Sequence, residues 1–205
     1  YKQKLWDGYL RLFNPLTRQI YRGLAPQVLE WATKRGYTYE YDDEDLDNSF
    51  SVEEATEFVE QLNPKHRPRD YQINAFVHAI RSKRRIVISP TGSGKSLLLY
   101  LTCNFLLKQG KRGLLIVPRS ALVEQMYSDF QDYSTNNGKD MEKYCHRVYS
   151  GKDKVTDKPI CISTWQSLFR MPKEYFQQFD YVICDEVHQA QAKALTDIIG
   201  KCTNA

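Results

Sequence analysis

Residues 86–101 read Ile86-Val-Ile-Ser-Pro-Thr-Gly-Ser-Gly-Lys-Ser96-Leu-Leu-Leu-Tyr-Leu101. An apolar run, a loop with two glycines and a second apolar run follow one another, and this order predicts a strand, a loop and a helix. Glycines let backbone N–H groups turn inward, and a helix that begins near Lys95 directs the positive end of its dipole to the same place. The stretch is therefore typical of a phosphate-binding loop.

Each residue of this loop has a chemical task. The backbone of Thr91-Gly-Ser-Gly94 would surround the phosphates, Lys95 can reach the β- and γ-phosphates, and the Ser96 hydroxyl can bind Mg²⁺. We thus expect Thr91, Gly92, Ser93, Gly94, Lys95 and Ser96 to bind the nucleotide. The loop departs from G-x-x-x-x-G-K-[ST], because Ser89 stands where the first glycine would. The alternative is a plain glycine–serine turn, and the predicted strand and helix on either side argue against it.

An acidic pair follows another apolar run. Tyr181-Val-Ile-Cys184 leads directly into Asp185-Glu-Val-His188. Ligands of open parallel sheets bind at the carboxyl ends of the strands, so Asp185 is expected to hold Mg²⁺ through water and Glu186 to act as the general base. Taken alone, such a pair is as often only a helix start that uses the helix dipole. The phosphate-binding loop favours the catalytic interpretation.

The order of segments from residue 69 onward predicts an α/β fold. Strands are expected at residues 85–89, 113–117, 160–163 and 181–184, with a further one at 146–149, and helices at 70–82, 94–109, 120–136 and 189–200. Strands separated by helices indicate βαβ units and a parallel sheet. The strands are almost continuously apolar, as expected where helices cover both faces of a sheet.

The first 62 residues differ in charge from the rest. Residues 1–36 carry seven basic and two acidic side chains, whereas residues 37–62 carry ten acidic and no basic ones. We expect a hairpin around Asn14-Pro15, a helix that begins at Pro26, a strand at 37–41, an acidic linker and a helix capped by Ser51. The predicted organisation is a small α+β accessory domain over residues 1–62, truncated at its start and suited to nucleic acid by its basic segment, and a main domain over residues 63–205.

The composition excludes several classes of protein. The 205 residues are 41% hydrophobic and 26% charged, and no apolar run reaches the length of a membrane-spanning helix. The five cysteines form no C-x-x-C pair, which argues against a disulfide framework and a zinc site. We therefore expect a cytoplasmic protein, in the host cell if a phage encodes it. A chain that starts at Tyr1 rather than Met is expected to be a fragment.

Five segments in order resemble superfamily 2 helicases of the DEAD/DEAH-like type. The resemblance covers residues 69–188, and its segments are Arg69–Gln72 (Q-motif), Ser89–Ser96 (motif I), Leu115–Gln125 (motif Ia), Cys161–Gln166 and Asp185–His188 (motif II). It implies a RecA-like ATP-binding domain that uses ATP and Mg²⁺. It further implies that Gln72 reads adenine, that Pro118, Arg119, Ser120 and Thr164 contact nucleic acid, and that His188 couples the nucleotide to neighbouring motifs.

Two of these residues have plainer alternatives. The amide of Gln72 suits the adenine edge, but it would also suit a solvent-facing position on a helix. Ser120 and Arg119 can bind a phosphate where a helix begins, and Ser120 can equally be an ordinary N-cap with Glu124 one turn inside. Both roles of Ser120 are compatible.

The N-terminal region is similar to that of recombination helicases of T4-like phages, through Trp6-Asp-Gly8, the helix at Pro26 and Arg35-Gly-Tyr37. This likeness implies an ATP-dependent helicase for branched DNA or RNA–DNA hybrids, in recombination and repair. The resemblance implies an arginine finger on a second RecA-like domain, which we expect to be missing from this chain, so the chain alone is expected to be nearly inactive. The alternatives are a duplex DNA translocase of the restriction or remodelling type, and a non-catalytic nucleic-acid-binding module. Intact Lys95, Asp185 and Glu186 argue against the last.

Overall fold

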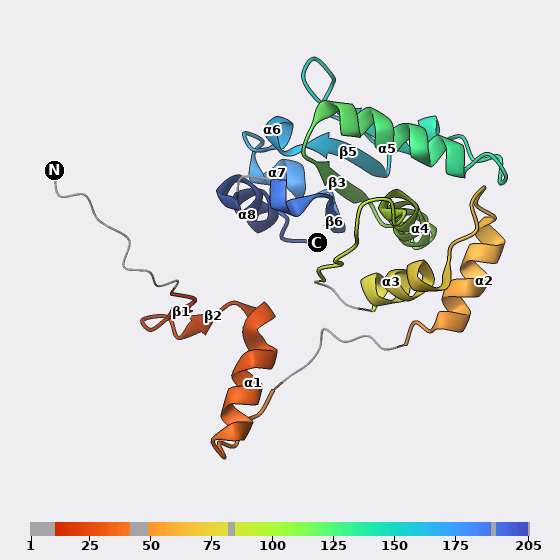
Figure 1. Cartoon of the computed structure of the whole chain (residues 1–205). Helices are drawn as coiled ribbons and strands as arrows, with labels where there is room; N and C mark the ends of the chain where they lie inside the picture. The colour runs from red at the N-terminus through yellow and green to blue at the C-terminus, as the bar shows by residue number, and fades with distance from the viewer. Residues whose placement is uncertain (1–10, 42–48, 82–84, 190–191, 205) are drawn as a thin grey trace. The chain divides into compact units, whose positions relative to one another are not determined.

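The computed structural model describes residues 11–41, 49–81, 85–189 and 192–204. The chain divides between Leu46 and Asp47 into two units, which we describe separately (Figure 1). Most of the expected acidic linker and the segment Trp6–Gly8 lie outside the described residues.

The described residues of the first unit, 11–41, form a short hairpin and one helix. β1 (Phe13–Asn14) pairs antiparallel with β2 (Gln19–Ile20), and a 3₁₀ turn, η1 (Arg22–Leu24), leads into α1 (Ala25–Lys34). The hairpin and the helix at Pro26 are as predicted, but the strand expected at residues 37–41 is absent from this described segment. The ring of Tyr37 instead stacks on Trp31, with centroids 5.5 Å apart.

The second unit begins with two helices that pack on each other. A capping box starts α2 (Val52–Leu62): the backbone N–H of Glu54 donates to Ser51 Oγ, and that of Ser51 donates to the Glu54 carboxylate. The rings of Phe58 on α2 and Phe76 on α3 (Asp70–Ile80) lie 5.8 Å apart in a shared core. By its contacts, α2 thus belongs with the second unit. A functional boundary at residues 62/63 stays a prediction.

Four parallel strands form the sheet of the second unit. They are β3 (Gly113–Val117), β4 (Cys145–Val148), β5 (Ile160–Thr164) and β6 (Tyr181–Cys184), in the spatial order β4-β5-β3-β6. All four lie where the apolar runs predicted strands. The α/β fold class with a parallel sheet is confirmed.

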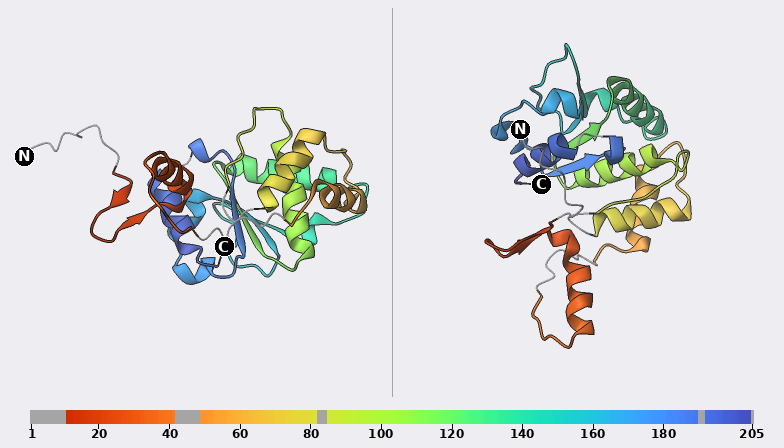
Figure 2. Two further views of the ribbon diagram at one scale, coloured as in Figure 1. Left: turned by 90° about the horizontal axis from the view of Figure 1, so that it is seen from below. Right: turned by 60° about the vertical axis from the view of Figure 1, so that its left-hand side comes forward.

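Helices cover both faces of this sheet (Figures 1 and 2). Alternate residues of β3 enter two cores: Leu115 and Val117 pack in the core that contains α2, α3, α4 (Lys95–Lys108) and α5 (Ser120–Tyr133), whereas Leu114 and Ile116 face the core of α6 (Trp165–Leu168), α7 (Lys173–Phe176) and α8 (Ala192–Lys201). Two 3₁₀ turns, η2 (Met141–Lys143) and η3 (Val187–Gln189), precede β4 and follow β6. Burial on both faces explains the continuous apolar character of the strands.

The strand expected at residues 85–89 is wrong for this structure. The segment forms no ladder with any described strand, and the side chains of Ile86 and Ile88 are 79% and 94% exposed. A strand needs a neighbour with free backbone groups. The run has the composition of a strand, but composition carries no information on whether another strand lies near enough to pair with it.

The cysteines contribute to packing. All five cysteines are free, and burial raises the pKa of each thiol, to about 12 for Cys103 and Cys161, so they act as small core residues.

Among the helices of the described residues, none is both long and apolar enough to span a membrane.

Candidate nucleotide-binding site

The phosphate-binding loop has the backbone that its sequence predicts. Gly92 and Gly94 adopt left-handed conformations with φ of 79° and 80°, and α4 begins at the next residue, Lys95. Residues other than glycine adopt this backbone conformation at a cost of about 1 kcal/mol. Within the described residues, no acceptor pairs with the backbone N–H groups of Thr91, Gly92, Gly94, Lys95 and Ser96. These unpaired donors at a helix N-terminus suit an anion.

Serine side chains close the loop on itself. Ser93 Oγ donates to the Pro90 carbonyl at 2.7 Å and lies 2.5 Å from Ser89 Oγ. Ser89 is the residue that departs from the motif, and its hydroxyl therefore has a structural role that a glycine could not supply. The departure leaves the loop ordered in the expected turn.

Lys95 joins the loop to the acidic pair. Its Nζ lies 3.2 Å from Glu186 Oε1 and donates to the Ser89 carbonyl at 3.4 Å. Loop and acidic pair come from segments 90 residues apart in the sequence, and the structure brings them together.

Asp185 stands at the end of β6, where its backbone N–H donates to the Ile116 carbonyl at 2.9 Å and so continues the ladder with β3. Burial raises the pKa of its carboxyl group above the ordinary value, the charge of Glu186 adds to the rise, and Lys95 opposes it. A divalent cation nearby would favour the ionised carboxylate again. The environment of Asp185 therefore fits a role next to Mg²⁺.

Glu186 is held in a strained backbone conformation. Its φ is 50°, in the left-handed region that glutamate rarely adopts. Its two carboxylate oxygens face two basic groups: Oε1 faces Lys95, and Oε2 lies 3.3 Å from His188 Nδ1. Such strain persists where surrounding contacts impose it, often at functional sites. The contact with Glu186 gives His188 a direct place at the site.

Ser96 has a partner that the sequence did not indicate. Its hydroxyl lies 2.7 Å from the hydroxyl of Tyr133, at the end of α5. The described residues contain no cluster of three or more His, Cys, Asp or Glu side chains that could hold a metal alone. Mg²⁺ usually takes one or two protein ligands and completes its coordination shell with water and substrate phosphates. Ser96 and Asp185 therefore match the type and number of protein ligands that Mg²⁺ requires.

Gln72 is buried against the loop, with 7% of its surface exposed, so the solvent-facing alternative is wrong. Its Nε2 donates to the Ser93 carbonyl at 2.9 Å, and its Oε1 accepts from the backbone N–H of Arg69 at 2.8 Å. The neighbouring Tyr71 hydroxyl also donates to the Ser93 carbonyl, at 3.0 Å. Sequence analysis assigned Tyr71 no role of its own, although it lies within the segment Arg69–Gln72, because a tyrosine has no residue-specific signal for such a contact.

A pocket of about 400 Å³ adjoins the loop. Its lining combines loop backbone with a basic segment and two aromatic rings: Lys65, His66, Arg67, Arg69, Tyr71, Gln72, Gly92, Ser93, Gly94, Leu97 and Tyr133. Lys65 is anchored by an ion pair with Asp132 and by a 2.9 Å backbone bond to the Tyr133 carbonyl. The volume and the two tyrosine rings suit the sugar and base of a nucleotide.

The residues expected to meet nucleic acid follow β3 and β5. Arg119 and Ser120 are exposed, whereas Pro118 is buried and its carbonyl accepts from Gln166 Nε2 at 3.2 Å. The N-cap of α5 is Arg119, so the expectation that Ser120 caps the helix is wrong: Ser120 is already helical and makes no cap bond. Thr164 is only 5% exposed, and its hydroxyl lies 3.0 Å from Ser167 Oγ.

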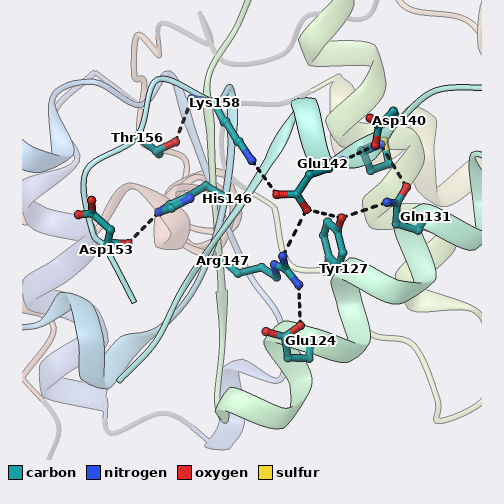
Figure 3. Close-up of polar contacts among 11 residues, drawn as sticks. Glu124, Tyr127, Gln131, Asp140, Glu142, His146, Arg147, Asp153, Thr156 and Lys158 are labelled. Atoms are coloured by element: carbon teal, nitrogen blue, oxygen red, sulfur yellow. Dashed lines mark hydrogen bonds and ion pairs between the residues drawn. The ribbon is translucent and has the colours of Figure 1, made fainter. Parts of the chain in front are cut away.

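A polar network that the sequence did not reveal joins α5 to β4 (Figure 3). Arg147 pairs with Glu124 at 2.9 Å and with Glu142 at 3.3 Å, and Glu142 also accepts from Tyr127 at 2.6 Å and Lys158 at 3.1 Å. Glu124 lies one turn inside α5, as expected, and its carboxylate belongs to this network. The network fixes the helix that follows β3, and it lines no part of the pocket.

Comparison with known proteins gives close and distant relatives. The chain is 31% identical over 207 residues to the ATP-dependent DNA helicase uvsW of Enterobacteria phage T4, a match over 97% of this chain and 41% of that protein. It is 29% identical over 120 residues to the reverse gyrase of Pyrobaculum aerophilum, over 53% of this chain and 10% of the relative. The chain thus spans less than half the length of these relatives.

The crystal structure of the UvsW helicase from bacteriophage T4 has the same fold. It superposes with a TM-score of 0.84 at 30% identity, over 97% of this chain and 73% of that one. The RecA-like class of the sheet is thereby confirmed. The family model described as type III restriction enzyme, res subunit, matches residues 65–205. The chain therefore belongs to this family, which consists of ATP-dependent helicase domains of superfamily 2.

Proposed function

We propose that this chain is the ATP-binding motor domain of a DNA helicase, and that the loop at residues 90–96 holds the phosphates of ATP. The observation that carries the proposal is the 3.2 Å ion pair between Lys95 of the loop and Glu186 of the acidic pair. Through this ion pair, a residue that binds phosphate and a residue that can act as general base are in direct contact.

In the proposed mechanism the residues have distinct roles. The unpaired N–H groups of the loop and Lys95 bind the phosphates. Ser96 and Asp185 would hold Mg²⁺, Asp185 through water. Mg²⁺ supplies charge neutralisation on the phosphates when bound. Lys95 must leave Glu186 to meet the phosphates, and the released Glu186 carboxylate then orients a water molecule and accepts its proton. His188, already on the other oxygen of Glu186, couples this change to neighbouring segments.

The adenosine part is assigned to the pocket of about 400 Å³, whose wall includes Arg67 and Arg69. Nucleic acid is assigned to the carboxyl ends of β3 and β5, where Arg119 and Ser120 are free to bind backbone phosphates. Pro118 and Thr164 would support that surface from beneath, since both are buried.

DNA is the proposed substrate, because the T4 relative is a DNA helicase. The proposal also includes RNA–DNA hybrids and branched junctions as substrates, and a role in recombination or repair. The proposal includes a location in the cytoplasm, that of the host cell if a phage encodes the protein.

Duplex translocation without strand separation is the second candidate. The matching family model is named after a restriction enzyme subunit, which supports this class. A forked substrate distinguishes the two in a longer protein that contains this domain: a helicase releases the displaced strand, whereas a translocase displaces a bound triplex-forming strand or protein and leaves the fork paired.

ATP turnover tests the proposal itself. We expect ATPase activity in a longer protein that contains this domain, stimulated by DNA and abolished by Lys95→Ala, and very little in the 205-residue chain. The low activity is expected because an arginine finger supplied by a second domain contributes a factor of about 10³–10⁵ in related enzymes. Unchanged turnover in Lys95→Ala would refute the assignment of the site.

A further inference from the structure

The hydroxyl groups of Ser96 and Tyr133 lie 2.7 Å apart, the ordinary distance of a hydrogen bond between two hydroxyls. Ser96 is the second residue of α4 and Tyr133 is the last residue of α5, so two separate helices meet at this contact. Among the described residues, the Ser96 side chain makes no other hydrogen bond. The hydroxyl expected to bind Mg²⁺ is thus already held by one partner.

Tyr133 is itself fixed by contacts with two other segments. Its ring packs edge-on against the rings of Tyr100 on α4 and of His66, with centroids 5.6 Å and 5.8 Å away. Its backbone carbonyl accepts from the N–H of Lys65 at 2.9 Å. Because the phenol cannot move freely, its hydrogen bond favours one rotamer of the Ser96 side chain.

A hydroxyl that binds a metal ion needs an acceptor for its proton. It has one proton and two lone pairs, and only a lone pair can bind a cation. When a lone pair of Ser96 faces Mg²⁺, its proton has to point elsewhere, and the Tyr133 oxygen is placed to accept it. Asp185 does not have this role in the structure: its Oδ1 accepts from the backbone N–H of Glu186 at 3.0 Å, and no hydrogen bond joins it to Ser96.

We propose that Tyr133 is a positioning residue for Mg²⁺: it accepts the Ser96 proton and so directs a lone pair of the Ser96 hydroxyl to the cation. This inference rests on the proposed function, because it concerns the Mg²⁺ of the same nucleotide site. It makes a specific claim. The Tyr133 hydroxyl strengthens the binding of Mg²⁺–nucleotide, adds nothing to the binding of metal-free nucleotide, and acts only through Ser96.

The test is a fluorescence titration of the 205-residue chain with ADP that carries an N-methylanthraniloyl group on the ribose. Each protein is titrated once with Mg²⁺ and once with EDTA, and the ratio of the two dissociation constants gives the gain in affinity from the metal. The proteins compared are the wild type, Tyr133→Phe, Ser96→Ala, the double variant of these two, and Tyr127→Phe.

Tyr127→Phe is the matched control. It also removes a hydrogen-bonded hydroxyl from α5, one that donates to Glu142 at 2.6 Å, but Tyr127 does not line the pocket. A general loosening of α5 would therefore act in both variants, whereas an effect on Mg²⁺ binding is expected from Tyr133 alone. Circular dichroism melts establish that each variant is folded.

We expect Tyr133→Phe to lower the gain from Mg²⁺ by about 2- to 10-fold, as for one lost hydrogen bond, without changing the affinity in EDTA. Tyr127→Phe should leave the gain unchanged. Ser96→Ala should lower the gain at least as much as Tyr133→Phe, and the double variant should lose no more than Ser96→Ala.

Four results would overturn the inference and leave the proposed function in place. They are a wild type that binds the probe without any gain from Mg²⁺, an unchanged gain in Tyr133→Phe, an equal loss in Tyr127→Phe, and an effect of Tyr133→Phe that appears in EDTA or persists in the Ser96→Ala background. A wild type that binds the probe neither with Mg²⁺ nor in EDTA would overturn the proposed function, and the inference with it.

Discussion

Gly113→Ala is expected to destabilise the sheet that positions the acidic pair. Gly113 begins β3 and lies opposite Tyr181 in the register of β3 with β6. A Cβ at this glycine would lie 1.9 Å from Tyr181 Cζ and 2.2 Å from both Cε2 and Oη, so the ring crosses directly over the glycine. Alanine fits only if the ring of Tyr181 moves, and β6 carries Asp185 and Glu186 at its other end.

The magnitude follows from the site. Overpacking of a core typically costs about 1–3 kcal/mol, and replacing glycine by alanine within a strand gains back about 0.5–1 kcal/mol of backbone entropy. The difference between these two ranges is about 0–2.5 kcal/mol. The 1.9 Å approach to the ring favours the upper part of that range, so we expect a net loss of about 1–2.5 kcal/mol in the free energy of unfolding. In a Tyr181→Ala background the obstacle is gone, and Gly113→Ala should then cost nothing or stabilise slightly.

Urea denaturation followed by tryptophan fluorescence and circular dichroism measures both effects. The control is the complete cycle of wild type, two single variants and the double variant. A change below about 0.5 kcal/mol for Gly113→Ala, or the same cost with and without Tyr181, would show that the ring does not close over the glycine as the structure has it.

Three further predictions concern the site and the stability of its frame. Lys95→Ala should lower Mg–ADP affinity at least ~10-fold, because the lost contact with the phosphates is charged. The melting temperature should change little, because the ion pair with Glu186 is partly exposed; calorimetric titration that finds equal affinity would contradict the prediction. The hydrogen bond from Tyr127 and the Lys158 ammonium hold the pKa of Glu142 below its ordinary 4.5, so the stability that this carboxylate contributes is present above pH 4.5 and is lost as the pH falls through the lowered value. Melts between pH 7 and pH 3 should show this loss, and it should be smaller in Glu142→Gln; identical pH profiles would count against the network. Ser51→Ala should cost about 0.5–2 kcal/mol in urea unfolding through the lost capping box, whereas an unchanged midpoint would mean that the cap is dispensable.

The sequence predicted the parallel sheet because each of its strands is an apolar run bounded by turn residues. It also predicted that Lys95 and Glu186 share one site, since the carboxyl ends of parallel strands lie at one edge. Two glycines and a following helix were enough to predict the loop conformation, as φ values of 79° and 80° require glycine.

Contacts that depend on a distant partner could not be predicted from the sequence. The run at residues 85–89 has strand composition, but no pairing edge of the described strands reaches it. Tyr133 approaches Ser96 from the far end of another helix, a juxtaposition set by helix packing rather than by any motif. Arg147, Glu124 and Glu142 form their network across three elements, and none has a sequence spacing that would reveal the others.

The central claim is that nucleotide phosphates lie in the loop, beside the acidic pair. Paramagnetic relaxation by Mn²⁺–ADP tests it directly, because the ion broadens backbone amide signals in its immediate neighbourhood. We predict selective broadening of the amides of Gly92, Gly94, Lys95 and Glu186, and its loss in Lys95→Ala. Broadening centred on other parts of the chain, or an equal effect in Lys95→Ala, would contradict the account.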